Sequence, residues 1–121
     1  MDIQYLTSED QARFAELLHE NDAELTQIFA QLMVQMEVDT DYDTVMLSFV
    51  GDYRLRVAVE DSPYIIVIDE DAQDITLLTS DDYNHEVEDF VEQCDFDEDG
   101  VATVVDIMAS RILSDENDGF Q

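Results

Sequence analysis

The chain contains no lysine, and only four arginines occur among its 121 residues. Aspartate and glutamate together number 32, so the formal net charge at pH 7 is -28. A protein that binds DNA or RNA directly needs a basic stripe to neutralise phosphates. Four arginines cannot provide such a stripe, and we therefore expect no direct contact with nucleic acid.

Cysteine is also scarce. Cys94 is the only cysteine, which excludes an intramolecular disulfide and favours a reducing compartment. The opening residues MDIQYLTSED lack the basic and apolar regions of a signal peptide, and apolar runs such as YIIVI are too short to cross a membrane. These absences predict a soluble protein of the cytoplasm, or of the host cytoplasm if the gene is viral, with no membrane partner.

The apolar content, in contrast, is ordinary for a globular protein. Apolar residues make up 45% of the chain, so acidic residues have not replaced the core. The length suits one domain. We predict a single α+β domain over residues 1–113 and a frayed acidic tail over residues 114–121, where the sequence SDENDGFQ is polar.

Apolar residues recur at helical spacing near both ends of the chain. Two N-terminal helices are predicted, with Thr7 or Ser8 as the cap of the first and Asn21 as the cap of the second. Two further helices are predicted over about 80–94 and 103–113, joined by an acidic loop. The C-terminal part should therefore be a helix–loop–helix.

Between these helices, short runs rich in β-branched and aromatic residues predict strands. The runs VMLSFV, YRLRVAV, YIIVI and DITLLT are separated by turn residues and indicate an antiparallel meander of three or four strands. A two-residue turn at Gly51 and Asp52 would pair Val50 with Tyr53.

That register predicts a sheet face on which apolar and basic side chains are mixed. Leu47 and Phe49 would share this face with Arg54 and Arg56. Either a helix covers the face and the arginines reach neighbouring carboxylates, or the face binds a partner or a second copy of the chain. The oligomeric state stays open, with a dimer as one outcome.

The densest acidic stretch, DFDEDGVATVVD, runs from Asp95 to Asp106 and has glycine at its sixth position. With its flanks, residues 84–113, it resembles an EF-hand, the helix–loop–helix unit that binds calcium. The resemblance implies that the calcium ligands are Asp95, Asp97, Asp99, the carbonyl of Val101, Thr103 and Asp106. Asp106 departs from the family pattern, which has glutamate at the last position.

The same stretch has a second interpretation that involves no metal. It can be a tight acidic turn, with Gly100 as a left-handed helix cap and Asp97 or Asp99 near the N-terminus of the following helix. Calcium is therefore the one cofactor that the sequence suggests, and the turn interpretation involves none.

No arrangement of residues indicates an enzyme. Carboxylate pairs occur throughout the chain, so no single pair marks a general acid and base. His19 and His85 lack the spacing of a metal pair, and carboxylates beside Cys94 disfavour its thiolate. A glycine-rich phosphate loop is also missing.

A charge of -28 costs stability through self-repulsion and needs a physical explanation. Concentrated salt, calcium or a basic partner would each provide one. We favour the partner: a chain that displays carboxylates as densely as phosphates would imitate nucleic acid and inhibit a DNA- or RNA-binding protein. Small virus-encoded inhibitors of restriction, CRISPR or nucleoid proteins offer an analogy of charge and size.

The carboxylates expected to contact such a partner form four clusters along the sequence. They are Asp39, Asp41 and Asp43; Asp69, Glu70, Asp71 and Asp74; Asp81, Asp82, Glu86, Glu88, Asp89 and Glu92; and Asp95 to Asp99. The main alternative function is calcium binding by the loop of residues 95–106. A third is an acidic regulator that resembles a secretion chaperone, whose working surface would be the sheet face around Leu47 and Phe49.

Overall fold

The computed structural model describes residues 2–19, 24–51, 53–60, 62–80 and 89–118. The helices in these ranges are α1 (Ser8–Leu18), α2 (Glu24–Asp39) and α3 (Glu98–Asp118). The strands are β1 (Asp2–Tyr5), β2 (Thr44–Phe49), β3 (Arg54–Val59), β4 (Tyr64–Asp69), β5 (Asp74–Thr79) and β6 (Asp89–Asp95). None of these described helices has the length and apolar character needed to span a membrane.

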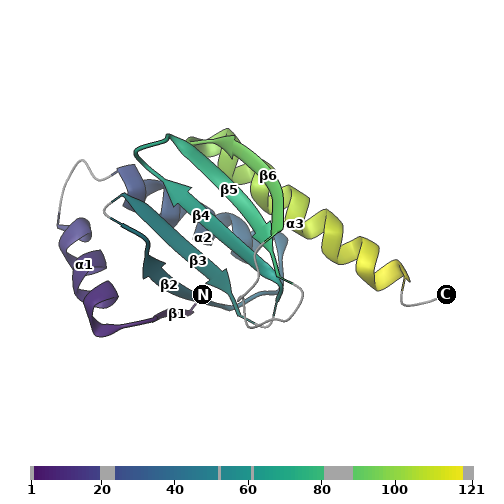
Figure 1. Ribbon diagram of the computed structural model, residues 1–121. Coiled ribbons are helices and arrows are strands. Elements are labelled where there is room, and N and C mark those ends of the chain that lie inside the picture. Colours follow the sequence, from purple (N-terminus) through teal and green to yellow (C-terminus); the bar gives the residue numbers. More distant parts are fainter. Residues whose placement is uncertain (1, 20–23, 52, 61, 81–88, 119–121) are drawn as a thin grey trace.

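All six strands belong to one mixed sheet in the order β1-β2-β3-β4-β5-β6. β1 runs parallel to β2, and every other neighbouring pair is antiparallel. Figure 1 shows α2 and α3 against one face of this sheet, while α1 lies beside the edge formed by β1 and β2. The opposite face carries none of the described helices and is named here the open face.

The core lies between the sheet and the pair α2 and α3. α2 turns an apolar stripe inward because Leu25, Ile28, Leu32 and Met36 recur every three or four residues. The buried partners from α3 and the sheet are Val101, Val104, Val105, Met108, Val45, Leu47, Leu55, Val57, Val59, Ile66, Ile68, Ile75 and Leu77. Burying each such side chain contributes about 1.5–3 kcal/mol, so this layer is the main source of stability.

The chain is α+β, but the predicted architecture is wrong in two respects. β2 to β5 correspond to the four predicted runs, yet the meander of three or four strands is only the middle of a larger mixed sheet that β1 and β6 extend on both sides. The C-terminal helix–loop–helix is also wrong, because Asp89–Asp95 is a strand. Residues 81–88, which that helix would include, and Asn21 lie outside the described residues.

A β-bulge explains why β6 resembles a helix in sequence. The register between β5 and β6 shifts at Leu77 and Leu78, which breaks the usual alternation of side chains. As a result, Val91 and Cys94 both pack against the core, whereas Phe90 is 64% exposed. A spacing of three residues between two inward side chains is what a helix would also show.

The register between β2 and β3 differs by one residue from the prediction. The backbone N–H of Val50 donates to the carbonyl of Arg54 at 2.9 Å, so three residues rather than two connect the strands. Gly51 supplies the positive φ of 76° in this loop. A one-residue shift moves every side chain of one strand to the other face. Leu47 therefore lies under the helices, and its predicted grouping with Arg54 and Arg56 is wrong.

α1 is fixed at both its cap and its contact with the sheet. Thr7, one of the two predicted caps, forms a capping box with Asp10: each accepts a hydrogen bond from the backbone N–H of the other, at 3.2 and 3.1 Å. The second oxygen of Asp10, Oδ1, accepts from the backbone N–H of Phe49 at 3.0 Å. One carboxylate thus caps α1 and ties the helix to the end of β2.

The start of α3 lies directly against the end of β6. A Cβ atom on Gly100 would stand 1.8 Å from the backbone carbonyl oxygen of Asp95. Gly100 belongs to the first turn of α3 and has no positive φ, so its predicted role as a left-handed cap is wrong. Glycine is required here because a side chain would collide with the backbone of Asp95, and not because the backbone is in a left-handed conformation.

Gly100→Ala should lower the free energy of unfolding by roughly 1–3 kcal/mol, because the added methyl group forces α3 away from β6. Urea denaturation followed by circular dichroism measures this loss. Gly51→Ala is the control: nothing lies within 4 Å of its Cβ position, and only its φ of 76° is unfavourable, at about 1 kcal/mol. A Gly100→Ala variant as stable as the parent would contradict the close approach of α3 to β6.

Candidate functional site

Two of the predicted acidic clusters lie at opposite ends of the sheet. β2 and β4 run in the same direction, so the turn between β4 and β5 lies at the end where β2 finishes. Asp39, Asp41 and Asp43 precede β2 and lie at the other end. Strands of six residues are about 20 Å long, so the two clusters are separated by about that distance.

The turn between β4 and β5 meets a second acidic segment. Asp74 lies opposite Asp95 in the register of β5 and β6, and the side-chain amide of Gln93 donates to Asp74 Oδ2 at 2.7 Å. α3 begins just after β6, so its first acidic residues follow at the same end. We name the resulting group the acidic turn end: Asp69, Glu70, Asp71, Asp74, Asp95, Asp97, Glu98 and Asp99.

The acidic turn end keeps its charge at a cost to the fold. Like charges directly opposite each other in a sheet are destabilising, and Asp74 and Asp95 are such a pair. Most members of the group face solvent, because the side chains of five are exposed: Asp71, Asp95, Asp97, Glu98 and Asp99. The arrangement therefore gathers exposed carboxylates at one end of the sheet although their repulsion lowers stability.

Asp69 differs from the rest of this group because it holds the turn. The residue as a whole is only 8% exposed. Oδ2 accepts from Nε of Arg54 at 3.1 Å, and Oδ1 accepts from the backbone N–H of Ala72 at 3.0 Å. Both carboxylate oxygens are thus engaged within the fold, and Asp69 is a structural residue rather than a surface charge.

The remaining predicted clusters are placed in part. At the far end of the sheet, Asp39 accepts a hydrogen bond from the side chain of Gln35, and Asp43 accepts one from Thr44 Oγ1 at 3.1 Å. Asp41 is exposed beside them. Of the third cluster, Asp89 and Glu92 are exposed on β6, whereas Asp81, Asp82, Glu86 and Glu88 lie outside the described residues.

The six residues expected to bind calcium are divided between a strand, a cap and a helix. Asp95 ends β6, while Asp99, Val101, Thr103 and Asp106 belong to α3. Asp97 caps α3, because its Oδ1 accepts the backbone N–H of Gly100 at 2.8 Å. Among the described residues, no three His, Cys, Asp or Glu side chains are grouped as a metal ion would require. Calcium binding stays a prediction from the sequence.

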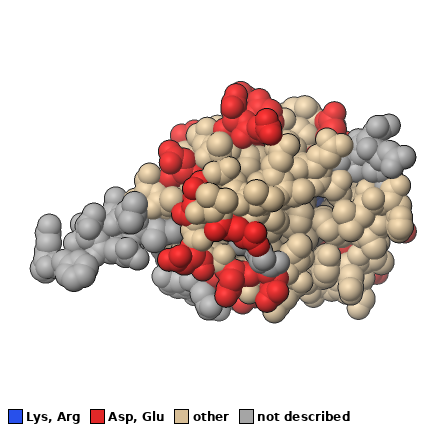
Figure 2. Space-filling view, turned by 180° about the vertical axis from the view of Figure 1, so that it is seen from behind, with Lys and Arg blue, Asp and Glu red and all other residues tan. Residues whose placement is uncertain are grey.

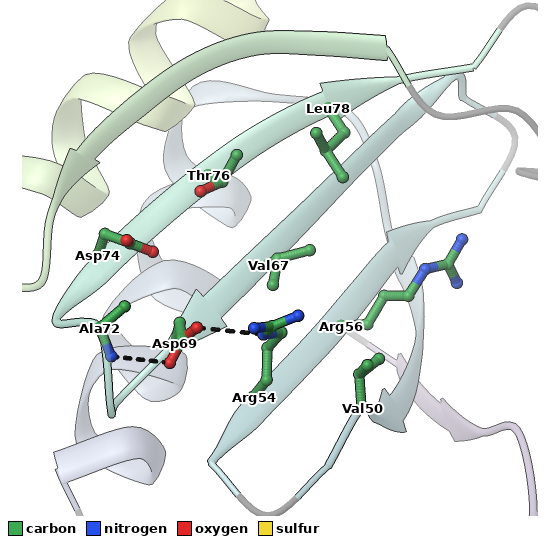
Figure 3. A pocket seen from close by; sticks show the side chains of 9 residues that line it. All are labelled: Val50, Arg54, Arg56, Val67, Asp69, Ala72, Asp74, Thr76 and Leu78. Atoms are coloured by element: carbon green, nitrogen blue, oxygen red, sulfur yellow. Dashed lines mark hydrogen bonds and ion pairs between the residues drawn. The ribbon is translucent and has the colours of Figure 1, made fainter.

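The open face holds a hollow of about 560 Å³ near the same end of the sheet. Figure 3 shows Arg54 and Arg56 of β3 beside Val67 of β4, with Arg54 turned toward Asp69 of β4, while Asp74 lies on β5. Two arginines and two aspartates give this hollow no net charge. Leu47 is fully buried on the other face, so the apolar surface expected for a chaperone-like regulator cannot be centred on it.

Cys94 is a partly buried thiol of β6 that packs against the core. Burial raises its pKa above the ordinary value, and the nearby carboxylates of Glu92, Asp95 and Asp97 raise the pKa further. The neutral thiol is therefore favoured at physiological pH. This environment is unsuited to a nucleophile, as the acidic neighbours in the sequence indicate.

The grouping of Asp74 with Asp95 was missed by sequence reasoning. Residues 89–95 were interpreted as helical, which removed any reason to place Asp95 opposite β5. One usable signal was the pair Phe90 and Val91, because β-branched and aromatic residues favour strands. Comparisons with protein-family models, curated proteins and solved structures found no match, so function is inferred from the described residues alone.

Asp97→Ala should lower the free energy of unfolding by about 1 kcal/mol, because α3 loses its cap. Asp97→Asn keeps an acceptor oxygen and should retain most of that stability. Urea denaturation of both variants, with and without a calcium chelator, measures these changes. Equal stability of Asp97→Ala and Asp97→Asn would show that the capping hydrogen bond contributes little.

Proposed function

We propose that the chain is a non-catalytic nucleic-acid mimic, which inhibits a DNA- or RNA-binding protein by occupying its basic cleft. The observation that carries this proposal is the pairing of Asp74 with Asp95, which joins two acidic segments into the acidic turn end. Five exposed carboxylates there come from the turn after β4, the end of β6 and the start of α3. They offer a cationic partner a dense anionic surface on rigid elements.

The energetics of such a contact resemble those of nucleic acid. A basic cleft releases counterions when it meets a polyanion, and this release weakens as salt rises. Several carboxylates share the interaction, and neighbouring carboxylates can partly compensate for the loss of one. No single carboxylate should therefore dominate the binding free energy. The proposal also explains why Asp74 and Asp95 lie opposite each other, although this pairing of like charges destabilises the sheet. Both carboxylates would contribute to binding the partner.

The class of partner follows from the charge of the chain. Restriction, CRISPR and nucleoid proteins all carry lysine- and arginine-rich surfaces for nucleic acid, and this chain has the opposite sign of charge over most of its length. The acidic turn end is proposed as the centre of contact. Asp39, Asp41 and Asp43, about 20 Å away, are a separate group against which this choice can be tested.

The proposal predicts that the chain displaces a labelled DNA or RNA from at least one purified protein of these three types, measured by fluorescence anisotropy. Displacement should weaken by about tenfold or more when the salt concentration is raised from about 50 to about 200 mM. No single carboxylate substitution should abolish it. Failure to displace nucleic acid from every protein tested, or displacement that salt leaves unchanged, would refute mimicry.

Two matched variants test where the contact lies. The first carries Asp71→Asn, Asp95→Asn, Glu98→Gln and Asp99→Asn; the second carries Glu37→Gln, Asp39→Asn, Asp41→Asn and Asp43→Asn. Each removes four charges, so both have a net charge of -24 instead of -28. The first should weaken displacement by about tenfold or more, and the second much less, because only the first alters the proposed contact. Equal losses would contradict a centre at the acidic turn end.

A further inference from the structure

A groove of about 500 Å³ lies between α2 and α3, on the side of these helices that faces away from the sheet. Every residue that α2 contributes to its lining is uncharged, among them Ala30 and the exposed Val34. The α3 side of the groove combines the carboxylates of Glu98 and Asp99 with the small side chain of Ala102. The groove therefore has one neutral side and one acidic side.

The neutral side continues along α2 as a stripe of exposed apolar residues. Ala30, Val34 and Val38 recur every four residues, and the exposed fractions of the two valines are 62% and 75%. Figure 2 looks onto the side of the molecule where α2 and α3 lie, and it shows acidic side chains in groups beside a broad area of other residues. Exposed apolar surface that polar groups surround often marks an interaction site.

Gln31 adds an unsatisfied hydrogen-bond acceptor to the lining of the groove. Its Oε1 atom is buried and has no hydrogen-bond partner within the described part of the chain. Such an atom costs free energy unless a donor reaches it. A donor on an occupant of the groove would satisfy this oxygen once the amide of Gln31 turns outward.

A helix is the element that fits between α2 and α3. The backbone groups of both helices are used within the helices themselves, so they offer few partners to the N–H and C=O groups of an extended segment. An incoming helix satisfies its own backbone groups. The small side chains of Ala30 and Ala102 let its axis approach closely, and a helix laid into an apolar groove is a recurring mode of recognition.

The charges of the groove determine which helix it favours. Glu98 and Asp99 are exposed in the first turn of α3, where they attract lysine or arginine, whereas the α2 side favours apolar side chains. A second copy of the chain would bring a charge of -28 to these carboxylates, and anionic lipid would also be repelled by them. Charge complementarity therefore selects a basic partner.

We propose that the groove binds an amphipathic helix of a partner protein, with the apolar stripe of that helix against Ala30 and Val34 and basic residues on one flank against Glu98 and Asp99. These two carboxylates also belong to the acidic turn end. The inference thus rests on the proposed function in one respect, which is that the helix belongs to the same basic partner. It adds a criterion that charge alone lacks, because only basic proteins that present such a helix would fill the groove.

Two labelled peptides of about 18 residues test the groove by fluorescence anisotropy with the full chain. Both are made of the same Leu, Lys, Ala and Gln residues and have equal charge. In the patterned peptide the leucines recur every three or four residues and the lysines follow one flank; in the rearranged peptide the leucines are spread around the helix. Circular dichroism verifies that the two are equally helical.

The patterned peptide should bind about tenfold or more tightly than the rearranged one, because burial of a single leucine accounts for about that factor. Raising the salt concentration from about 0.1 to about 1 M should weaken the binding of both peptides and leave their ratio nearly unchanged, since screening acts on charges and not on apolar burial. Equal affinity of the two peptides would overturn the groove as a helix-binding site.

Two matched double variants place the contact. Ala30→Gln with Ala102→Gln fills the groove without a change of charge and should reduce the preference for the patterned peptide to about twofold or less. Ala12→Gln with Ala15→Gln makes the same change at two exposed positions of α1 and should keep the full preference. Loss of the preference in the α1 variant, or its survival in the groove variant, would overturn the assignment.

The remaining outcomes separate this inference from its alternatives. If the chain alone forms a dimer in sedimentation velocity and the groove variant abolishes it, the occupant is a second copy, and the partner helix is overturned. Equal affinity of the two peptides leaves nucleic-acid mimicry intact, because mimicry requires only charge. Failure to displace nucleic acid refutes mimicry, whereas a preference for the patterned peptide would still support the groove.

Discussion

The burial of α2 and α3 against one face of the sheet is the interaction on which everything else in this molecule depends. Each fully buried Leu, Ile or Met contributes about 1.5–3 kcal/mol. A pair of exposed carboxylates in water repels by about 1 kcal/mol at 4 Å, and by less at larger separation or in salt. A single apolar layer can therefore offset many surface repulsions. The acidic surface is possible because this layer contains almost no charge.

Much of the fold follows from apolar periodicity, and the failures have specific physical causes. The runs that became β2 to β5 were recognisable from β-branched residues, and the inward stripe of α2 from its helical spacing. β1 is only four residues long, too short for alternation to stand out. β6 contains a bulge that makes its inward residues recur as they would in a helix. The loop after Val50 was one residue longer than its Gly-Asp pair suggested, and this shift exchanged the faces.

For the candidate site, too, the sequence revealed which residues are present but not how the fold places them. The acidic clusters were visible in the sequence, because they are local runs of Asp and Glu. Their grouping was not, because the contact between Asp74 and Asp95 exists only if residues 89–95 form a strand. Likewise, Asp69 resembled any other surface carboxylate until its contacts with Arg54 and Ala72 were known. Sequence reasoning found the charge, and tertiary pairing decided which charges lie together.

The parallel pairing of β1 with β2 has a consequence for the order of folding. Asp2 lies opposite Thr44, so the chain must complete α1, α2 and their connections before the sheet can accept its first strand. The hairpins from β2 to β5 join residues close in sequence and form early, because short loops lose less entropy on closure. We expect β1 to dock last. β1 then finds its place after strands that follow it in the sequence, and the edge of β2 remains open to other strands until it does.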